Sequence, residues 1–290
     1  MRTRVTGATK EVIIAHDLPT VLIGERINPT GKKKLAAALQ AGDLERVRQE
    51  AIAQVRAGAD ILDVNVGVPG LNEEELLPRA VQAVMEVVDV PLCLDSDNPK
   101  ALAAALRVCK GKPIINSVNG QERRLDEVLP LVKQYSAAVI GLTMDDQGIP
   151  KDVETRVAIA HKIAQRVEAA GIPREDLIMD CLCLTVATDT QSALVTFETM
   201  RRVRDELGVN QTLGASNISF GLPDREVING IFLALAIAHG LTCPNVDVAK
   251  VRAAVTAADL LLGRDNYAMR YIRAFRARQV ALQPPAASGA

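Results

Sequence analysis

Eight short apolar runs alternate with segments of helical character along this sequence. The runs are TVLIG (20–24), ILDVNV (61–66), PLCLD (91–95), PIINS (113–117), AVIGLT (138–143), LIMDC (177–181), TLGASN (212–217) and LTCPN (241–245). Strands that alternate with helices pair in parallel through right-handed crossovers. Eight such units in about 250 residues are typical of a closed barrel. The sequence therefore predicts an α/β fold with a single (β/α)8 TIM barrel.

The segments between the runs carry the start and stop signals of helices. In the first long segment, Asp43 is a good N-cap, apolar residues recur at helical spacing, and Gly58 stands where the helix should end. Seven more helices are expected, at 72–88, 99–109, 123–135, 152–170, 190–207, 224–239 and 247–262. Because no GxGxxG motif follows any strand, an open dinucleotide-binding sheet is disfavoured.

The expected barrel occupies residues 19–265. Residues 1–18 are expected to form an N-terminal leader, and residues 266–290 a C-terminal helix followed by a disordered tail from residue 283. The first residues lack the apolar run of a signal peptide, and no apolar stretch approaches the roughly 20 residues of a membrane span. These features predict a cytoplasmic protein that does not bind membranes.

Charge and cysteine content narrow the classes of partner. The net charge is -1 and the charged residues are interspersed, so no nucleic-acid partner is indicated. The five cysteines are odd in number and lack CxxC spacing, which argues against a disulfide framework or a structural zinc site. We therefore expect no metal site, and a small molecule or a protein as the partner.

Polar residues follow the carboxyl ends of nearly all the runs, where a barrel binds its ligands. They are mainly carboxylates and carboxamides, namely Glu25, Asn28, Asp63, Asn65, Asp95, Asn116, Asp180, Asn217 and Asn245. Any single one could instead cap the following helix. Together they match a flat heterocycle such as a pterin, whose 2-amino group and N3–H donate to a carboxylate while its 4-oxo group accepts from an amide.

Six strand-end segments are also recognisable as a set. They are GERINPTGKKK (24–34), ILDVNVG (61–67), CLDS (93–96), INSVN (115–119), GLTMDDQGIPKD (141–152) and SNISFGLPDR (216–225). In this order they resemble the pterin-binding methyltransferases, which include methyltetrahydrofolate:corrinoid methyltransferases and the folate module of cobalamin-dependent methionine synthase. The resemblance implies a dihydropteroate synthase-like barrel, a homodimer, and cobalamin supplied by a corrinoid-binding partner protein.

The resemblance also implies roles for individual residues. Asp95, Asn116 and Asp180 would bind the edge of the pterin ring, and Asn217 would be the catalytic residue that reaches N5, the nitrogen bearing the methyl group. The remaining pterin-binding residues would be Glu25, Asn28, Asp63, Asn65 and Ser219. The implied enzyme is a methyltetrahydrofolate:corrinoid protein Co-methyltransferase, with methyltetrahydrofolate and tetrahydrofolate as its substrate and product.

Two other functions stay open at this point. Dihydropteroate synthase shares the barrel and the pterin pocket, but it normally carries a lysine in the seventh-strand motif, where this chain has SNISF (216–220). A folate-binding subunit without catalysis would need the same pterin contacts. The only basic run, Lys32 to Lys34, fits either a solvated helix start or a contact with the glutamate tail of a folate.

Overall fold

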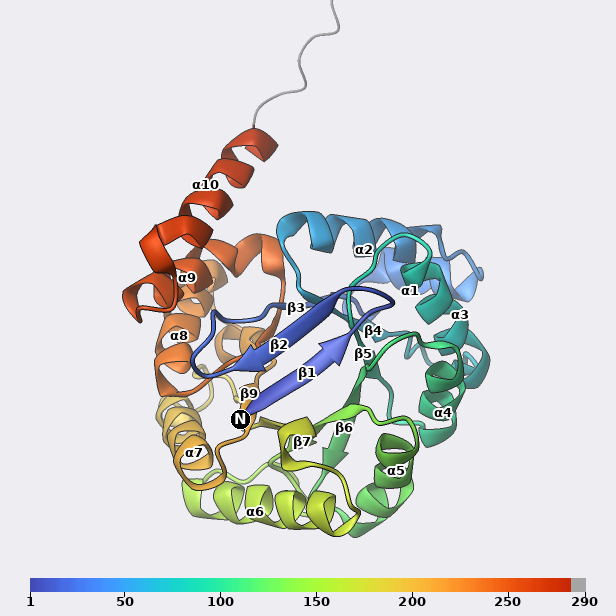
Figure 1. The fold of residues 1–290 in the computed structure, drawn as a ribbon, viewed down its shortest axis with the longest axis horizontal. Helices are drawn as coiled ribbons and strands as arrows, with labels where there is room; N and C mark the ends of the chain where they lie inside the picture. The colour runs from blue at the N-terminus through green and yellow to red at the C-terminus, as the bar shows by residue number, and fades with distance from the viewer. Residues whose placement is uncertain (283–290) are drawn as a thin grey trace, which may run out of the picture.

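Eight parallel strands form one sheet in the computed structural model, which describes residues 1–282 (Figure 1). The strands are β3 (Ile23–Ile27), β4 (Ile61–Asn65), β5 (Leu92–Asp95), β6 (Ile114–Asn119), β7 (Ala138–Leu142), β8 (Leu177–Asp180), β9 (Asn210–Thr212) and β10 (Asn245–Val246). They follow one another in chain order, with β10 beside β3. Beyond β9, Gly214 pairs in parallel with Asn245, which closes the ring. The predicted TIM barrel is confirmed.

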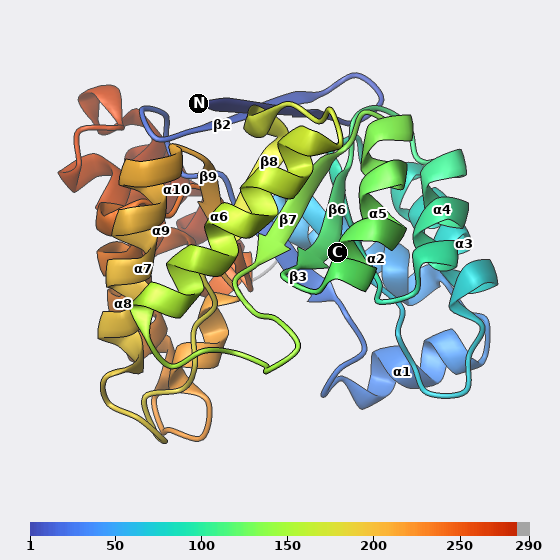
Figure 2. The same cartoon turned by 90° about the horizontal axis from the view of Figure 1, so that it is seen from below.

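Helices surround the barrel on its outside (Figures 1 and 2). They are α1 (Lys33–Gln40), α2 (Glu45–Ala57), α3 (Glu73–Met85), α4 (Pro99–Val108), α5 (Glu122–Gln134), α6 (Val153–Ala169), α7 (Ser192–Leu207), α8 (Arg225–His239), α9 (Val248–Leu261) and α10 (Met269–Leu282). The eight predicted helices correspond to α2 to α9. As predicted, Asp43 accepts a hydrogen bond from the amide of Glu45 at the start of α2, and Gly58 ends this helix with a left-handed φ of 104°. The separate helix α1 was not predicted.

A two-stranded antiparallel hairpin precedes the barrel, in the segment expected to be a leader. Its strands are β1 (Arg2–Thr6) and β2 (Glu11–Ala15). Val5, Val12 and Ile14 are buried in the same apolar cluster as the residues that fill the barrel interior. The hairpin lies across one end of the barrel, opposite the end where α1 lies (Figure 2). It therefore closes the amino-terminal end of the barrel and leaves the carboxyl end for ligands.

Alternate residues of each strand point into the barrel, and their character changes along the strand. Apolar inward residues near the closed end form one cluster, which includes Ile23, Ile61, Cys93, Ile114, Ile178 and Cys243. Two positions further along these segments, the residues on the same face are Glu25, Asp63, Asp95, Asn116, Asp180 and Asn245. In β7 the corresponding position holds an apolar residue, Leu142. An apolar floor therefore supports a polar layer at the open end, which we call the mouth.

The last helix of the described residues, α10, extends away from the barrel beyond α9 (Figure 1). A short 3-10 helix, η3 (Asn266–Ala268), joins these two helices, and α10 packs through Ala274, which is buried. The predicted tail from residue 283 lies outside the described residues. Within residues 1–282, no helix is both long and apolar enough to cross a membrane.

Candidate active site

The side chains of the polar layer hydrogen-bond to one another between neighbouring strands. Asn65 donates to Asp95 over 2.9 Å, and Asn116 donates to Asp63 over 3.3 Å. The register pairs Asn65 with Asp95 and Asp95 with Asn116, so β4, β5 and β6 present these groups at one level. The structure therefore brings together four of the residues that the sequence predicts to bind a pterin.

Burial changes the protonation behaviour of the carboxyl groups in this layer. Loss of hydration raises the pKa of Asp180 to about 7, although the amides of Leu182 and Gly214 donate to its carboxylate and oppose that rise. Burial likewise raises the pKa of Asp95 to about 6, against the stabilising hydrogen bond from Asn65. Such carboxylates are poorly solvated acceptors, and a ligand that donates to them restores the hydrogen bonds lost on burial.

Asp63 is the most deeply buried of these acids, with 1% of its surface exposed. Burial, and then the neighbouring charge of Asp95, raise its pKa well above the ordinary value. The Cys93 thiol and the Asn116 amide hydrogen-bond to it. Asp63 therefore fixes the orientation of the Asn116 side chain from below.

Two buried arginines hold the loops that carry the polar layer. Arg124, on α5, donates to the carbonyl oxygens of Ser96 and Asp97 at 2.9 and 2.8 Å, after β5, and to that of Ser117 at 2.8 Å, in β6. Ser96 and Ser117 directly follow Asp95 and Asn116 in the chain. One guanidinium group therefore fixes the spacing of two neighbouring strand ends.

The second arginine, Arg156 on α6, holds together the segments that follow β7 and β8. It donates to the carbonyl oxygens of Pro150, Cys181 and Leu182 at 2.7, 2.9 and 2.8 Å. Only 1% of its surface is exposed. Neither arginine was predicted as a site residue from the sequence, although each lies on the apolar face of its helix, where a charged residue requires a buried partner.

The segment that carries Asn217 differs from its predicted form. The seventh strand was predicted over residues 212–217, but β9 ends at Thr212 and Ala215–Ser219 form a 3-10 helix, η2. The chain turns because the amide of Asn217 bonds to the carbonyl of Gly214. Asn217 is exposed, and a side chain on Gly214 would come within 3.3 Å of its Nδ2 atom. Since Gly214 also donates to Asp180, Asn217 lies at the rim above that carboxylate.

Three further residues that were predicted to bind the pterin do not all face the mouth. Glu25 points into the mouth and accepts a hydrogen bond from the Ser216 hydroxyl at 3.2 Å. Asn28 accepts from the amide of Thr30, so it shapes the loop after β3. Ser219 is fully buried, and its hydroxyl donates to Asn229 and accepts from Arg225. Asn28 and Ser219 are thus tied to loop structure, whereas Glu25 belongs to the polar layer.

Some buried polar atoms near the mouth have no protein partner. Among the described residues, Asn245 Oδ1 and Thr143 Oγ1 accept and donate no hydrogen bond. Asn245 occupies the inward position of β10 in the polar layer. A buried acceptor without a partner is costly, so this oxygen is suited to a ligand that donates. Within residues 1–282, no three side chains are grouped so as to hold a metal ion.

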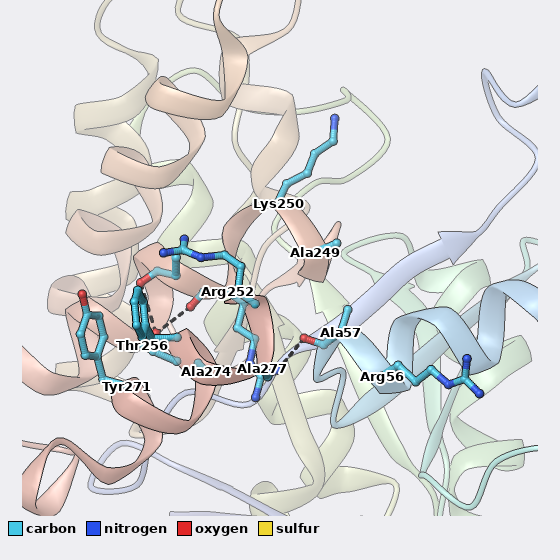
Figure 3. A pocket seen from close by; sticks show the side chains of 12 residues that line it. Arg56, Ala57, Ala249, Lys250, Arg252, Thr256, Tyr271, Ala274 and Ala277 are labelled. Atoms are coloured by element: carbon cyan, nitrogen blue, oxygen red, sulfur yellow. Dashed lines mark hydrogen bonds between the residues drawn. The ribbon is translucent and has the colours of Figure 1, made fainter. Parts of the chain in front are cut away.

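A groove on the outer wall provides a contrast to the mouth. It has a volume of about 210 Å³ and lies between α2, α9 and α10, with Arg252, Tyr271 and Ala274 among its lining residues (Figure 3). Its lining contains neither a carboxylate nor a carboxamide. This groove therefore lacks the carboxylates and carboxamides that line the mouth.

A comparison with protein families matches residues 24–247 to the family described as pterin binding enzyme. The chain belongs to the pterin binding enzyme family. The matched range begins in β3, ends just after β10, and so includes the whole barrel sheet apart from the first residue of β3. The resemblance predicted from the strand-end motifs is confirmed.

Curated relatives of this pterin-binding enzyme carry more specific names. The methylcorrinoid:tetrahydrofolate methyltransferase of Eubacterium limosum is 32% identical over 266 residues, covering 88% of this chain and 96% of the relative. The methionine synthase of Mycobacterium leprae is 34% identical over 247 residues, covering 80% of this chain. That match spans only 20% of the methionine synthase, so the chain corresponds to one part of it.

Solved structures of dihydropteroate synthases share the fold of this pterin-binding enzyme. The Yersinia pestis enzyme with a pterine-sulfa conjugate has a TM-score of 0.67 at 16% identity, covering 91% of this chain and all of the other. The Xanthomonas albilineans enzyme has a TM-score of 0.68 at 21% identity, covering 90% and 98% of the two chains. At this level of identity the likeness concerns the barrel alone.

Proposed function

We propose that this enzyme moves the N5 methyl group between methyltetrahydrofolate and the cobalt of a corrinoid carried by a partner protein. The observation that carries the proposal is the layer of buried and half-buried acids and amides at the mouth, in a chain similar over most of its length to a methylcorrinoid:tetrahydrofolate methyltransferase. The family match supports the pterin, and the relative's name supports methyl transfer.

The polar layer suits the hydrogen-bonding edge of a pterin. Asp180 and Asp95 offer carboxylate acceptors to the 2-amino group and N3–H, and the amide of Asn116 can donate to the 4-oxo group. The orientation of these groups is set by Asp63 and Asn65 and by the two buried arginines. Preorganised partners reduce the loss of entropy when the ring binds.

Catalysis requires stabilisation of the departing nitrogen. When the methyl group leaves N5, tetrahydrofolate becomes a good leaving group only if that nitrogen receives a proton or a strong hydrogen bond. A cobalt(I) corrinoid supplies the nucleophile. Asn217, at the rim above Asp180, is the residue that we assign to N5. Because a carboxamide is no general acid, it acts by a hydrogen bond that strengthens as N5 gains proton character.

An exposed apolar stripe on α8 supports the proposal that the enzyme is a homodimer. Val227, Ile231 and Leu235 on α8 recur at intervals of four residues and expose 53, 59 and 46% of their surface. An apolar stripe on one helix is typical of a protein contact, and we assign it to a homodimer. All five cysteines lie among the described residues and are free thiols, which supports a cytoplasmic location.

The test follows the absorbance of cobalt(I) cobalamin as it becomes methylcobalamin in the presence of methyltetrahydrofolate. Wild-type protein should catalyse the change, and Asn217→Ala should lose on the order of 100-fold in turnover, which is typical for one preorganised polar group. Asn266→Ala, an exposed asparagine in η3, is the matched control. A wild-type rate in Asn217→Ala would remove this residue from the mechanism. Folate binding without any methyl transfer would instead favour a non-catalytic subunit.

A further inference from the structure

A second groove lies beside the mouth, between the β3–α1 loop and α2. It has a volume of about 330 Å³. Its charged lining residues are Arg26, Lys32, Lys33, Lys34, Arg46 and Glu50. Five cations therefore face one carboxylate, whereas the protein as a whole has a net charge of -1. We call this feature the basic groove.

The cations of the basic groove are only weakly neutralised by the protein. Arg26 lies 3.5 Å from both Glu50 and Asp247, at the long end of ion-pair distances. The Nε atom of Arg46 is buried and has no hydrogen-bond partner among the described residues. Lys32 donates from Nζ to the carbonyl oxygens of Glu25 and Arg26. The groove thus retains donors and positive charge for an anion.

The amino terminus of α1 adds to this positive potential. The N-cap residue, Lys32, provides no side-chain cap, and the first turn contains no acidic residue. The helices α2, α5, α7, α8 and α9 also lack a side-chain cap, so the feature particular to the start of α1 is its run of three lysines. Three lysines at the positive end of a helix dipole are unfavourable unless an anion binds there.

The strand order places the basic groove where a folate tail would leave the mouth. The pterin-edge residues Asp95, Asn116 and Asp180 stand on β5, β6 and β8, so the centre of this set lies across the barrel from β10 and β3. In a folate, the tail is attached at C6, at the end of the ring system opposite the hydrogen-bonding edge. A ring bound by its edge therefore directs its tail towards β3. There Glu25 faces the mouth, and Arg26 lines the groove.

We propose that the basic groove binds the γ-linked glutamate chain of polyglutamyl folates. This inference rests on the proposed function, since the ligand is the tail of the same substrate. Each added glutamate brings one more carboxylate, and the lining of the groove has five cationic side chains against one carboxylate, a formal excess of four positive charges. Polyglutamyl methyltetrahydrofolate should therefore be preferred over the monoglutamate, and the preference should weaken as salt rises.

The experiment compares the dissociation constants of monoglutamyl and triglutamyl methyltetrahydrofolate by calorimetry. Wild-type protein should bind the triglutamate about tenfold more tightly, as expected for two additional exposed ion pairs. In the Lys33→Gln/Lys34→Gln double variant this ratio should fall below about threefold, and Arg46→Gln should lower it independently. The control is Lys110→Gln/Lys133→Gln, which removes two exposed lysines at the closed end and should keep the wild-type ratio.

The outcomes separate this inference from the proposed function. Equal affinity of wild-type protein for the two folates would overturn the inference while leaving the proposed function intact. So would a tenfold preference that persists in the double variant. Failure of both folates to bind wild-type protein would overturn the proposed function and the inference together.

Discussion

The substitution Asp180→Asn should stabilise the empty enzyme at pH 8 while it removes pterin binding. Burial raises the pKa of Asp180 from an ordinary 3.8 to about 7, so the folded protein retains a proton that the unfolded chain has released. The free energy of unfolding of the wild-type protein therefore decreases as the pH rises from 4 to 7. Each pH unit in this range is worth about 1.4 kcal/mol, so the total loss is about 4 kcal/mol.

An asparagine avoids this loss, because its side chain is never charged and its carbonyl oxygen can still accept from the amide of Leu182. Urea unfolding of both proteins at pH 5, 6, 7 and 8 measures the difference. The variant should gain up to about 4 kcal/mol at pH 8, and less than about 2 kcal/mol at pH 5. A gain that does not change with pH, or a variant less stable at pH 8, would refute the assignment of a destabilised carboxylate.

Three further predictions concern binding and assembly. The pterin edge requires ionised acceptors, so folate affinity should fall about tenfold per pH unit below 7, where Asp180 gains its proton. The affinity should fall more steeply below pH 6, where Asp95 also gains a proton. Calorimetry that finds a constant affinity from pH 5 to 8 would contradict this prediction. Arg156→Lys should lose about 3 kcal/mol of unfolding free energy and at least tenfold in folate affinity, because a lysine cannot donate to all three carbonyl oxygens. The control is Arg201→Lys at an exposed site, which should keep wild-type stability and affinity. Wild-type stability and affinity in Arg156→Lys would contradict the role given to this arginine. Ile231→Glu should convert the proposed homodimer to a monomer in analytical ultracentrifugation, and an unchanged mass would exclude α8 as the contact.

The barrel and its polar layer were predictable because both follow from short-range periodicity. A strand places residues two apart on the same face, so Ile61 and Asp63, or Ile178 and Asp180, can be assigned to floor and mouth without a structure. Helix boundaries followed from caps such as Gly58. The strand-end motifs then identified the family, which the match over residues 24–247 confirms.

Other features depend on contacts between distant parts of the chain. The hairpin of residues 2–15 has alternating exposed and buried residues, but the sequence does not show that its buried face covers the amino-terminal end of the barrel. The turn at Gly214 depends on pairing with Asn245, which lies 31 positions later in the chain. The roles of Arg124 and Arg156 depend on carbonyl groups of loops up to 28 residues away. Sequence periodicity contains no information on such partners.

The most direct measurement is the binding of methyltetrahydrofolate to the purified enzyme by calorimetry, in wild type and in single variants of the polar layer. We predict one folate per chain, with affinity reduced at least tenfold in Asp95→Ala and in Asp180→Ala, as expected when a charge-assisted hydrogen bond to the ring is lost. Asp17→Ala, at an exposed site in the closed-end segment, should bind like wild type. Absence of binding to wild type, or equal affinity in all four proteins, would contradict the claim that these carboxylates hold a pterin.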